Sequence, residues 1–154
     1  MSEPLIRRAT QDDFPHIVRM IRELAAHIGK GFVPKVSLEI LEADGPFGRD
    51  RFRIFIAENN GTVIGFCLYT FAFSGWRGKS GIFVEDLYIA PSARGSGLGR
   101  ELMDAALEAE AKDGISYIKL EVSNTDIAAI NFYRKSGFTF SETDAIMFFD
   151  RPES

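Results

Sequence analysis

Cysteine is nearly absent from this chain: Cys67 is the only one among 154 residues. A disulfide within the chain needs two cysteines and a cysteine-based metal cluster needs more, so the composition excludes both. Histidine is also scarce. His16 and His27 are the only two, and no carboxylates stand near them at the spacing of a metal site. We therefore expect no metal cofactor, and the low cysteine content suits a reducing compartment.

Positive charge is not in excess, and long apolar runs are missing. Lysine and arginine number 18 against 22 acidic residues, a net charge of -4, so no basic surplus neutralises the phosphates of a nucleic acid. No run of about 18 apolar residues predicts a membrane span, and residues 1–10 lack the apolar stretch of a secretion signal. We expect a cytoplasmic protein without nucleic-acid or membrane partners. Its mild acidity suits a cationic small substrate, although solubility alone explains it as well.

The length is enough for one domain with a full hydrophobic core and too short for two. Hydrophobic periodicity predicts alternating strands and helices with no repeat and no linker, a mixed α/β (α+β) domain around one central sheet. Its core covers residues 4–149. The expected strands are 5–9, 51–60, 61–73, 81–90, 116–122 and 145–149, and the expected helices are 12–28, 37–43, a helix ending near 113, and 126–136.

Two local signals fix parts of this pattern. The first helix has apolar residues at a period near 3.6, from Phe14 to Ile28. Its cap is Thr10 or Asp12, and we favour Asp12 because Pro15 then falls in the first turn, where a missing N–H costs nothing. Asn60-Gly61 between two strands is the strongest short signal for a β-hairpin.

A glycine-rich turn stands between the strand at 81–90 and the next helix. Its sequence from residue 94 is RGSGLGRELM, with glycines at 95, 97 and 99. Free N–H groups in such a turn and at a helix N-terminus converge on one spot, where the helix dipole favours an anion. The turn is therefore either a phosphate site or a tight strand-to-helix connection.

Counting rejects two other glycine motifs. A dinucleotide fingerprint that starts at Gly95 needs glycine at position 100, which is Arg100. A P-loop that ends in Lys79-Ser80 needs its leading glycine at position 73, which is Phe73. A nucleotide-binding protein of either kind is disfavoured.

The pattern Arg94-x-x-Gly97-x-Gly99, after VEDLYIAPSA and before an amphipathic helix, resembles the acetyl-CoA signature of the GNAT superfamily of N-acetyltransferases. The stretch AAINFYRKSGF at 128–138 resembles a later helix of that superfamily, and the element order agrees over residues 4–149. The resemblance implies the GNAT fold, with a V-shaped opening between the strands at 82–90 and 116–122 that takes the pantetheine arm of acetyl-CoA. The cofactor-binding residues that it implies are Leu87, Tyr88, Ile89, Arg94, Gly95, Ser96, Gly97, Leu98, Gly99, Arg100 and Asn124.

Within the superfamily the chain is most similar to the diamine (spermidine/spermine and thialysine) branch. The matching stretches are IRELA, GFCLYTF, Trp76 with Gly78-Lys79, and FVEDLYIAPSARGSGLG. This similarity implies acetylation of a polyamine, a diamine or a lysine-like amino acid, a homodimer, and Trp76 as a substrate contact or a packing anchor. Ile28 and Ser74 stand where the polyamine enzymes carry acids, which favours a shorter amine.

Two adjacent carboxylates, Glu85 and Asp86, interrupt an otherwise apolar strand. Unpaired burial of carboxylates costs several kcal/mol, about 3 or more, so a functional reason outweighs a merely solvated face. A regular strand directs the two to opposite faces, so only one of them points into the opening. By resemblance Glu85 is the base that deprotonates the amine, directly or through water, and Asp86 attracts the substrate cation.

Tyr133 is by resemblance the general acid for the coenzyme A thiolate; without the resemblance it reads as a core aromatic beside Phe132. A phenol with a pKa near ~10 stays protonated until the thiolate leaves. The asparagine usual seven residues before this tyrosine is Asp126 here, so Asn124 or Asp126 fills its role. A main-chain N–H, for example that of Ile89, serves as oxyanion donor.

The functional hypotheses differ in class. The first is a small-molecule amine N-acetyltransferase that uses acetyl-CoA by direct attack. The alternatives are acetylation of a peptide or protein amine and a non-catalytic acyl-CoA-binding sensor domain.

Overall fold

The computed structural model describes residues 3–29, 31–141, 147–148 and 150–152. The chain divides into two compact units, Met1–Glu121 and Val122–Ser154, and each is described here by itself.

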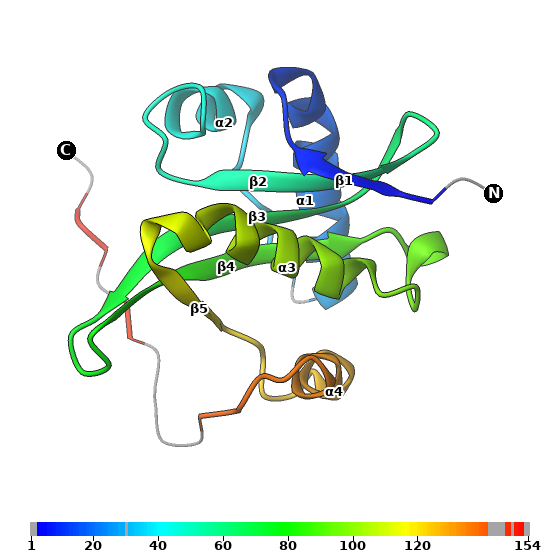
Figure 1. Cartoon of the computed structure of the whole chain (residues 1–154). Helices are drawn as coiled ribbons and strands as arrows, with labels where there is room; N and C mark the ends of the chain where they lie inside the picture. Colours follow the sequence, from blue (N-terminus) through cyan, green and yellow to red (C-terminus); the bar gives the residue numbers. More distant parts are fainter. Residues whose placement is uncertain (1–2, 30, 142–146, 149, 153–154) are drawn as a thin grey trace. The chain divides into compact units, whose positions relative to one another are not determined.

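The first unit is built on a five-stranded sheet with the order β1-β2-β3-β4-β5 (Figure 1). Neighbouring strands are antiparallel, except that β4 and β5 are parallel. The expected mixed sheet is therefore confirmed. In chain order the elements are β1 (Leu5–Arg8), α1 (Phe14–Ile28), α2 (Leu38–Asp44), β2 (Arg53–Asn59), β3 (Thr62–Ser74), β4 (Lys79–Ile89), α3 (Leu98–Glu110) and β5 (Ile115–Leu120).

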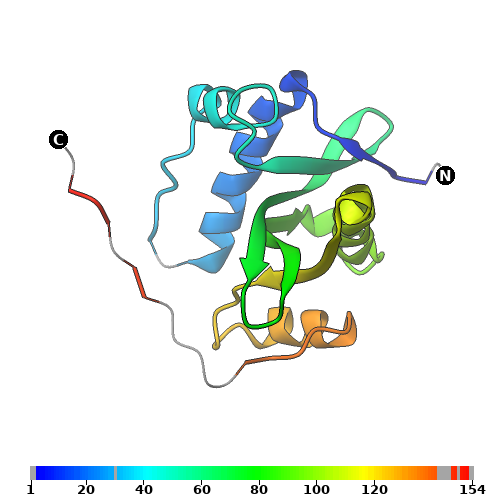
Figure 2. The same ribbon diagram turned by 60° about the vertical axis from the view of Figure 1, so that its left-hand side comes forward.

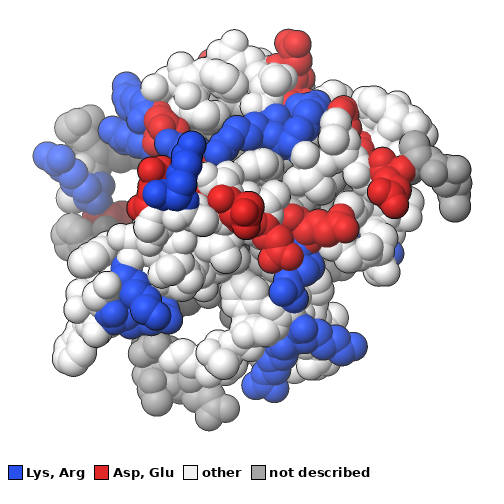
Figure 3. Space-filling model, viewed as in Figure 1, with Lys and Arg blue, Asp and Glu red and all other residues white. Residues whose placement is uncertain are grey.

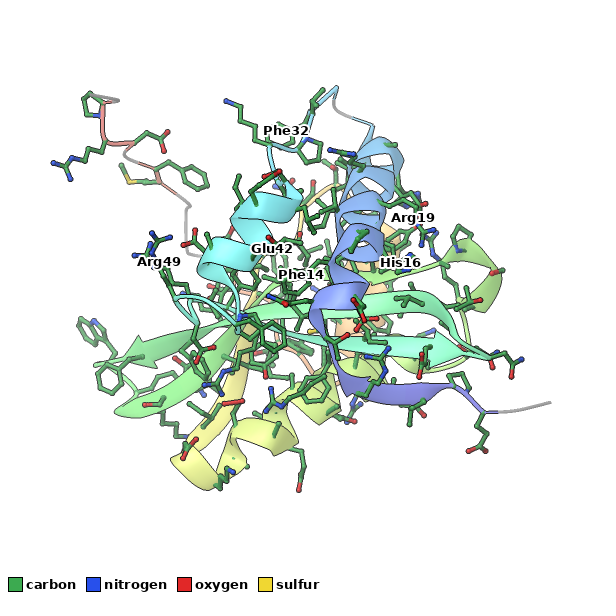
Figure 4. The ribbon with its side chains drawn as sticks, turned by 90° about the horizontal axis from the view of Figure 1, so that it is seen from above. Phe14, His16, Arg19, Phe32, Glu42 and Arg49 are labelled. Carbon is green, nitrogen blue, oxygen red and sulfur yellow. The ribbon has the colours of Figure 1, made fainter. Side chains whose placement is uncertain are left out.

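Helices cover both faces of this sheet. Figure 2 shows α1 and α2 on one side of the strands and α3 on the other. Figure 4 looks down on the α1 side, where Phe14 lies between α1 and α2, and His16 and Arg19 lie on the side of α1 away from α2. Phe14 is fully buried and Phe47 contacts it with ring centroids 6.0 Å apart. The core on this face also contains Ile17, Met20, Leu41, Ile54, Ile56, Phe66, Leu68 and Tyr88.

The first helix begins differently from the sequence prediction. A single 3-10 turn, Gln11–Asp13, follows Thr10, and α1 starts at Phe14 with Asp13 at its N-cap. The favoured cap Asp12 is therefore wrong, whereas the alternative Thr10 is the N-cap of the 3-10 turn, and its backbone N–H donates to Asp13 Oδ2 (2.7 Å). Pro15 does fall in the first turn. Ile28, the last apolar residue of the helical pattern, is about half exposed.

The hairpin between β2 and β3 turns at Asn60-Gly61, as predicted. Both residues have positive φ, 52° and 81°, which a type I′ turn requires. The strands on either side pair in antiparallel register from Arg53↔Tyr69 to Asn59↔Thr62. This hairpin supplies β3, the strand against which β4 is aligned.

The second unit contains α4 (Ile127–Lys135). Asp126 is its N-cap and accepts a hydrogen bond from the Ala129 N–H (3.1 Å). Ser136 is the C-cap, and Gly137 follows it with a φ of 97°. Of the strand predicted at 145–149, residues 145, 146 and 149 lie outside the described residues, and Met147 and Phe148 are not in a strand.

A buried carboxylate ties α3 to the first three strands. Glu110 is 1% exposed, and Arg53 Nη1 donates to both of its carboxylate oxygens at 2.8 Å. Arg8 Nη2 (3.2 Å) and the Tyr69 hydroxyl (3.3 Å) complete its partners. Burial alone raises the pKa of Glu110, but the hydrogen bonds from Arg53 and Arg8 outweigh it and hold that pKa below its ordinary value.

We expect Glu110→Gln to lower the free energy of unfolding by about 2 kcal/mol at pH 7, because two arginines lose their anionic partner. A carboxylate whose folded-state pKa is depressed contributes stability above its unfolded pKa and loses it as pH falls through the folded one. The difference between variant and wild type should therefore shrink in acid. Urea unfolding at pH 7 and pH 4 measures this, with Glu108→Gln on the exposed face of α3 as control. Equal losses in the two variants contradict the expectation.

Candidate functional site

The β4 strand changes its surroundings halfway along its length. It pairs with β5 from Ser80↔Ile115 to Val84↔Leu120. Beyond Val84, residues 86–89 pair only with β3 among the described residues. The ladder between β4 and β5 therefore ends at Val84, within the stretch where the opening was predicted.

The antiparallel ladder decides which backbone groups face this unpaired edge. The Ala90 N–H donates to the Ile64 carbonyl (2.8 Å), and hydrogen-bonded pairs alternate from there along the two strands. The Tyr88 backbone is therefore bonded to β3. The N–H and C=O groups of Leu87 and Ile89 point away from β3, toward the edge of β4 that pairs with β5 only up to Val84.

A β-bulge lies where the two strands part. Leu68 pairs with Asp86 and Tyr69 with Val84, so Glu85 is an extra residue in β4. Tyr69 lies on the face of the sheet that α3 covers, because its hydroxyl donates to Glu110, and Cys67, two residues earlier, shares this face. Their partners in β4, Val84 and Leu87, lie on the same face. Glu85 and Asp86 thus stand together opposite Leu68. The regular alternation, on which the prediction of opposite faces depends, is interrupted at this point.

The pKa values of the two carboxylates at the bulge are both raised above their ordinary values. Burial, followed by the charges of Asp86 and Glu121, raises the pKa of Glu85. Burial also raises the pKa of Asp86. Within the described part of the first unit neither has an ion-pair partner, and Glu85 is exposed while Asp86 is half-buried. Such groups bind protons more readily than ordinary surface carboxylates and attract cations.

The glycine-rich turn connects the end of β4 to α3. Gly95 and Gly97 have φ angles of 80° and 85°, and Gly97 is the N-cap of α3. No atom lies within 4 Å of a Cβ built on either glycine. The backbone conformation, and not a crowded neighbour, therefore requires glycine here.

The turn leaves backbone N–H groups free at the start of α3. The first i→i−4 hydrogen bond runs from the Glu101 N–H to the Gly97 carbonyl (3.1 Å), so the preceding N–H groups of Leu98, Gly99 and Arg100 have no partner within the helix. These donors and the helix dipole favour an anion at this end. The Ser96 hydroxyl donates to the Ala93 carbonyl (2.6 Å) and so stabilises the turn itself.

The charged side chains of the turn have partners in the protein. Arg100 Nε pairs with Asp104 one turn along α3 (3.2 Å). Arg94 Nε donates to the Ile89 carbonyl (2.8 Å), so its guanidinium reaches back to the end of β4. The outer face of α3 itself is acidic (Figure 3), with Glu101, Asp104 and Glu108 exposed.

Trp76 lies far from the carboxylates within one chain. It stands at the tip of the β3–β4 hairpin and is fully exposed. From Lys79 to Glu85 the strand runs about 20 Å at 3.3 Å per residue. The structure therefore does not bring Trp76 together with Glu85 in the same chain.

The second unit holds the remaining predicted residues. The Tyr133 ring on α4 contacts Phe132 and Phe138, with centroids 5.1 and 5.5 Å apart. The Asp126 carboxylate caps α4, whereas Asn124 lies in the turn that the Asp126 N–H closes on the Ser123 carbonyl (3.0 Å). Capping engages Asp126, which leaves Asn124 as the better candidate for the asparagine role.

Two interactions near the site were not predicted from the sequence. The Tyr88 hydroxyl donates to Glu23 Oε2 (2.9 Å), which links β4 to α1. Glu121 follows β5 and its charge acts on Glu85. Both relations join elements distant in sequence, and no local pattern indicates them. As predicted, Cys67 is buried; burial, and then the charge of Asp86, raises its pKa to about 12, so the thiol stays neutral.

Neither a metal-binding cluster nor a membrane-spanning helix occurs among the described residues. No group of three or more histidine, cysteine, aspartate or glutamate side chains there is arranged to hold a metal ion. In the same part of the chain, no helix combines the length and the apolar character needed to cross a membrane.

Comparison with known proteins agrees with this geometry. The family model described as "Acetyltransferase (GNAT) family" matches residues 18–138. The thialysine N-epsilon-acetyltransferase of Sus scrofa is 34% identical over 146 residues, 89% of this chain and 85% of that protein. A spermidine/spermine N(1)-acetyltransferase-like protein 1 of Homo sapiens is 29% identical over 139 residues, 86% of this chain and 20% of that protein.

A solved structure shares the fold. It is an aminoglycoside acetyltransferase from an uncultured soil metagenomic sample, in complex with sisomicin. The TM-score is 0.77 at 18% identity, over 97% of each chain. The chain therefore belongs to the acetyltransferase (GNAT) family, near its diamine branch, as the sequence motifs predicted. It is an acetyl-CoA-dependent N-acetyltransferase.

We expect Gly97→Ala to lower the free energy of unfolding by about 1 kcal/mol, the cost of a left-handed conformation for a residue with a Cβ. Gly97→Asn should cost less, because asparagine visits this conformation more readily. Gly75→Ala is the control: it has open space and no positive φ. Urea unfolding measures all three, and a Gly97→Ala variant no less stable than Gly75→Ala argues against the backbone constraint.

Proposed function

We propose that the protein transfers the acetyl group of acetyl-CoA to a primary amine of a small cationic molecule, such as a diamine, a polyamine or a lysine-like amino acid. The observation that carries the proposal is a pair of carboxylates, Glu85 and Asp86, that have no ion-pair partner among the described residues and lie where the pairing of β4 with β5 ends. The similarity to a thialysine N-epsilon-acetyltransferase over most of both chains supports a lysine-like acceptor. Peptide acetylation and a non-catalytic sensor are not favoured.

The described residues fit acetyl-CoA. The N–H and C=O groups of Leu87 and the N–H of Ile89 extend toward a pantetheine arm as a strand would, and the amides from Gly95 to Arg100 take the pyrophosphate. By resemblance to the family, Asn124 is a further proposed cofactor contact. Bound there, acetyl-CoA supplies an activated thioester whose carbonyl carbon accepts the amine directly.

The carboxylates prepare the amine. An alkyl amine with a pKa near ~10.4 is mostly protonated at pH 7, so a base must remove a proton before attack. Glu85 takes this proton through water, because its raised pKa brings it nearer to the working pH. Asp86 attracts the cationic substrate. The Ile89 N–H is the candidate donor to the developing oxyanion.

Tyr133 protonates the leaving thiolate. Its ring contacts Phe132 and Phe138, and its hydroxyl is the proposed proton donor. Transfer in this scheme is direct, from thioester to amine, without an acetylated residue.

The acceptor is shorter than a long polyamine. Ile28, at the end of α1, is apolar, and the Ser74 hydroxyl accepts the Arg77 N–H (3.1 Å). Neither offers a distant anion to a second or third ammonium group. Compact diamines and amino acids therefore fit better.

The protein is also proposed to be a cytoplasmic homodimer. The β3–β4 hairpin carries three exposed aromatic residues, Phe71, Phe73 and Trp76, at 44%, 73% and 103% exposure. Aromatic side chains grouped in this way are more typical of an interface than of a monomer surface. A second copy seated on this hairpin would bury Trp76.

Free-thiol release from acetyl-CoA tests the function across thialysine, lysine, putrescine, spermidine, an aminoglycoside and a short peptide. We expect turnover with a small diamine or lysine-like amine. Tyr133→Phe should reduce kcat by about 10²–10⁴-fold, because the ring contacts remain while the proton donor is lost. Acetyl-CoA binding without turnover on any amine argues for a sensor, and turnover on the peptide alone argues for a protein acetyltransferase.

We expect Glu85→Gln to abolish the acidic limb of the kcat/KM profile. In the wild type that limb lies above the ordinary carboxyl range, because the pKa of Glu85 is raised and activity rises as it deprotonates. A raised pKa also means that the charged form destabilises the fold at neutral pH, so the variant should be no less stable than the wild type. Rates from pH 5 to 9, with thermal unfolding as control, measure both. An unchanged limb assigns the base elsewhere.

A further inference from the structure

Arg94 makes its contacts at the end of β4 and not in the glycine turn. Its Nε donates to the Ile89 carbonyl at 2.8 Å, and its Cζ lies 5.5 Å from the centroid of the Tyr88 ring. The Tyr88 hydroxyl in turn donates to Glu23 of α1 (2.9 Å), and Arg19 lies 3.6 Å from Glu23. Figure 4 shows Arg19 on the side of α1 away from α2.

These contacts hold one peptide group from two sides. The Ala90 N–H and the Ile89 carbonyl belong to the same planar peptide unit. The N–H donates to Ile64 of β3 (2.8 Å), and the carbonyl accepts from Arg94. In the described part of the chain no second strand pairs with this end of β4, and the Arg94 side chain supplies the second support.

We propose that Arg94 is a positioning residue whose guanidinium fixes the Ile89–Ala90 peptide, and with it the backbone edge that binds the pantetheine arm, and is not a ligand of the coenzyme A phosphates. The inference rests on the proposed function of that edge. The side chain acts on acetyl-CoA through Ile89, while the Gly95–Arg100 amides bind the phosphates.

Two substitutions separate the support from a phosphate contact. In Arg94→Gln the amide nitrogen is as many bonds from Cα as Arg Nε, so it retains the donor to Ile89 without the charge. In Arg94→Lys the charge remains, but no donor stands at that position. If Arg94 positions the peptide, Arg94→Gln should retain cofactor binding and Arg94→Lys should not. If Arg94 binds a phosphate, Arg94→Lys should retain binding and Arg94→Gln should not.

The binding experiment uses two ligands, coenzyme A and pantetheine, which lacks every phosphate. We expect Arg94→Lys to weaken both by the same factor, roughly three- to tenfold for one hydrogen bond to a charged group in a solvent-exposed place. Arg94→Gln should bind pantetheine within about twofold of wild type by the same reasoning. Arg100→Gln, which removes one charge from the same turn, is the control for coenzyme A binding. The loss of coenzyme A affinity in Arg94→Gln should be no larger than the loss in Arg100→Gln.

A second readout needs no ligand. Hydrogen exchange of the Ala90 amide, followed by NMR in the free protein, should be faster in Arg94→Lys and unchanged in Arg94→Gln and Arg100→Gln. Thermal unfolding of each variant identifies any global loss of structure.

The outcomes divide clearly. The inference is overturned, and Arg94 is a phosphate ligand, if two results coincide. Arg94→Gln binds coenzyme A more weakly than the Arg100→Gln control does, and both Arg94 variants leave pantetheine binding and Ala90 exchange unchanged. No effect of either variant also overturns it. Failure of the wild-type protein to bind coenzyme A overturns the proposed function instead.

Discussion

The strand β4 pairs with β3 on one side as far as Ile89, but among the described residues its other side pairs with β5 only as far as Val84. Backbone N–H and C=O groups without partners cost free energy when they are removed from water, so strands inside sheets rarely stop pairing halfway. β4 does so between Val84 and Glu85, where the partner strand β5 ends its ladder and the bulge adds a residue. The two irregularities coincide because the bulge increases twist and bends β4 away.

The position of α3 follows from this break. β4 and β5 are parallel, so the chain must cross over between them through a helix on one face of the sheet. The crossover leaves β4 at Ile89 and enters α3 at Leu98, through the turn that requires positive φ at Gly95 and Gly97. The free amides of the α3 N-terminus therefore follow directly on the unpaired edge of β4. A ligand with an amide-containing arm and a phosphate group at one end matches that order of donors.

Local sequence signals predict much of this fold and little of the bulge. The apolar period of α1, Asn60-Gly61 and the glycine pattern each act within a few residues, and the structure has them where the sequence placed them. The Glu85 bulge depends on how β3 aligns with β4, which no short window contains. The start of α1 fails for a similar reason: Asp13 is bound by Arg7 of β1 (2.8 Å), which also pairs with Glu58 of β2. That network selects Asp13 over Asp12.

The contacts of long side chains also limit what the sequence predicts of the site. The motif implies a cofactor contact for Arg94, whereas in the structure its Nε donates to the Ile89 carbonyl. A side chain as long as arginine can reach either end of a short turn, so sequence alone fixes its backbone and not its contacts. The same holds for Tyr88, whose hydroxyl partner Glu23 lies 65 residues earlier.

Two sets of carboxylates in this fold have opposite surroundings, and the contrast bears on function. Glu110 is almost completely buried, yet arginines hold its pKa low, so its charge stabilises the protein. Glu85 and Asp86 are less enclosed, yet burial raises their pKa and no arginine among the described residues pairs with them, so their charges destabilise the protein. The same fold places two arginines, Arg8 and Arg53, against Glu110. Two carboxylates that lack a counter-ion in the described part of the chain lower its stability, and a cationic substrate is the partner that would compensate their charge.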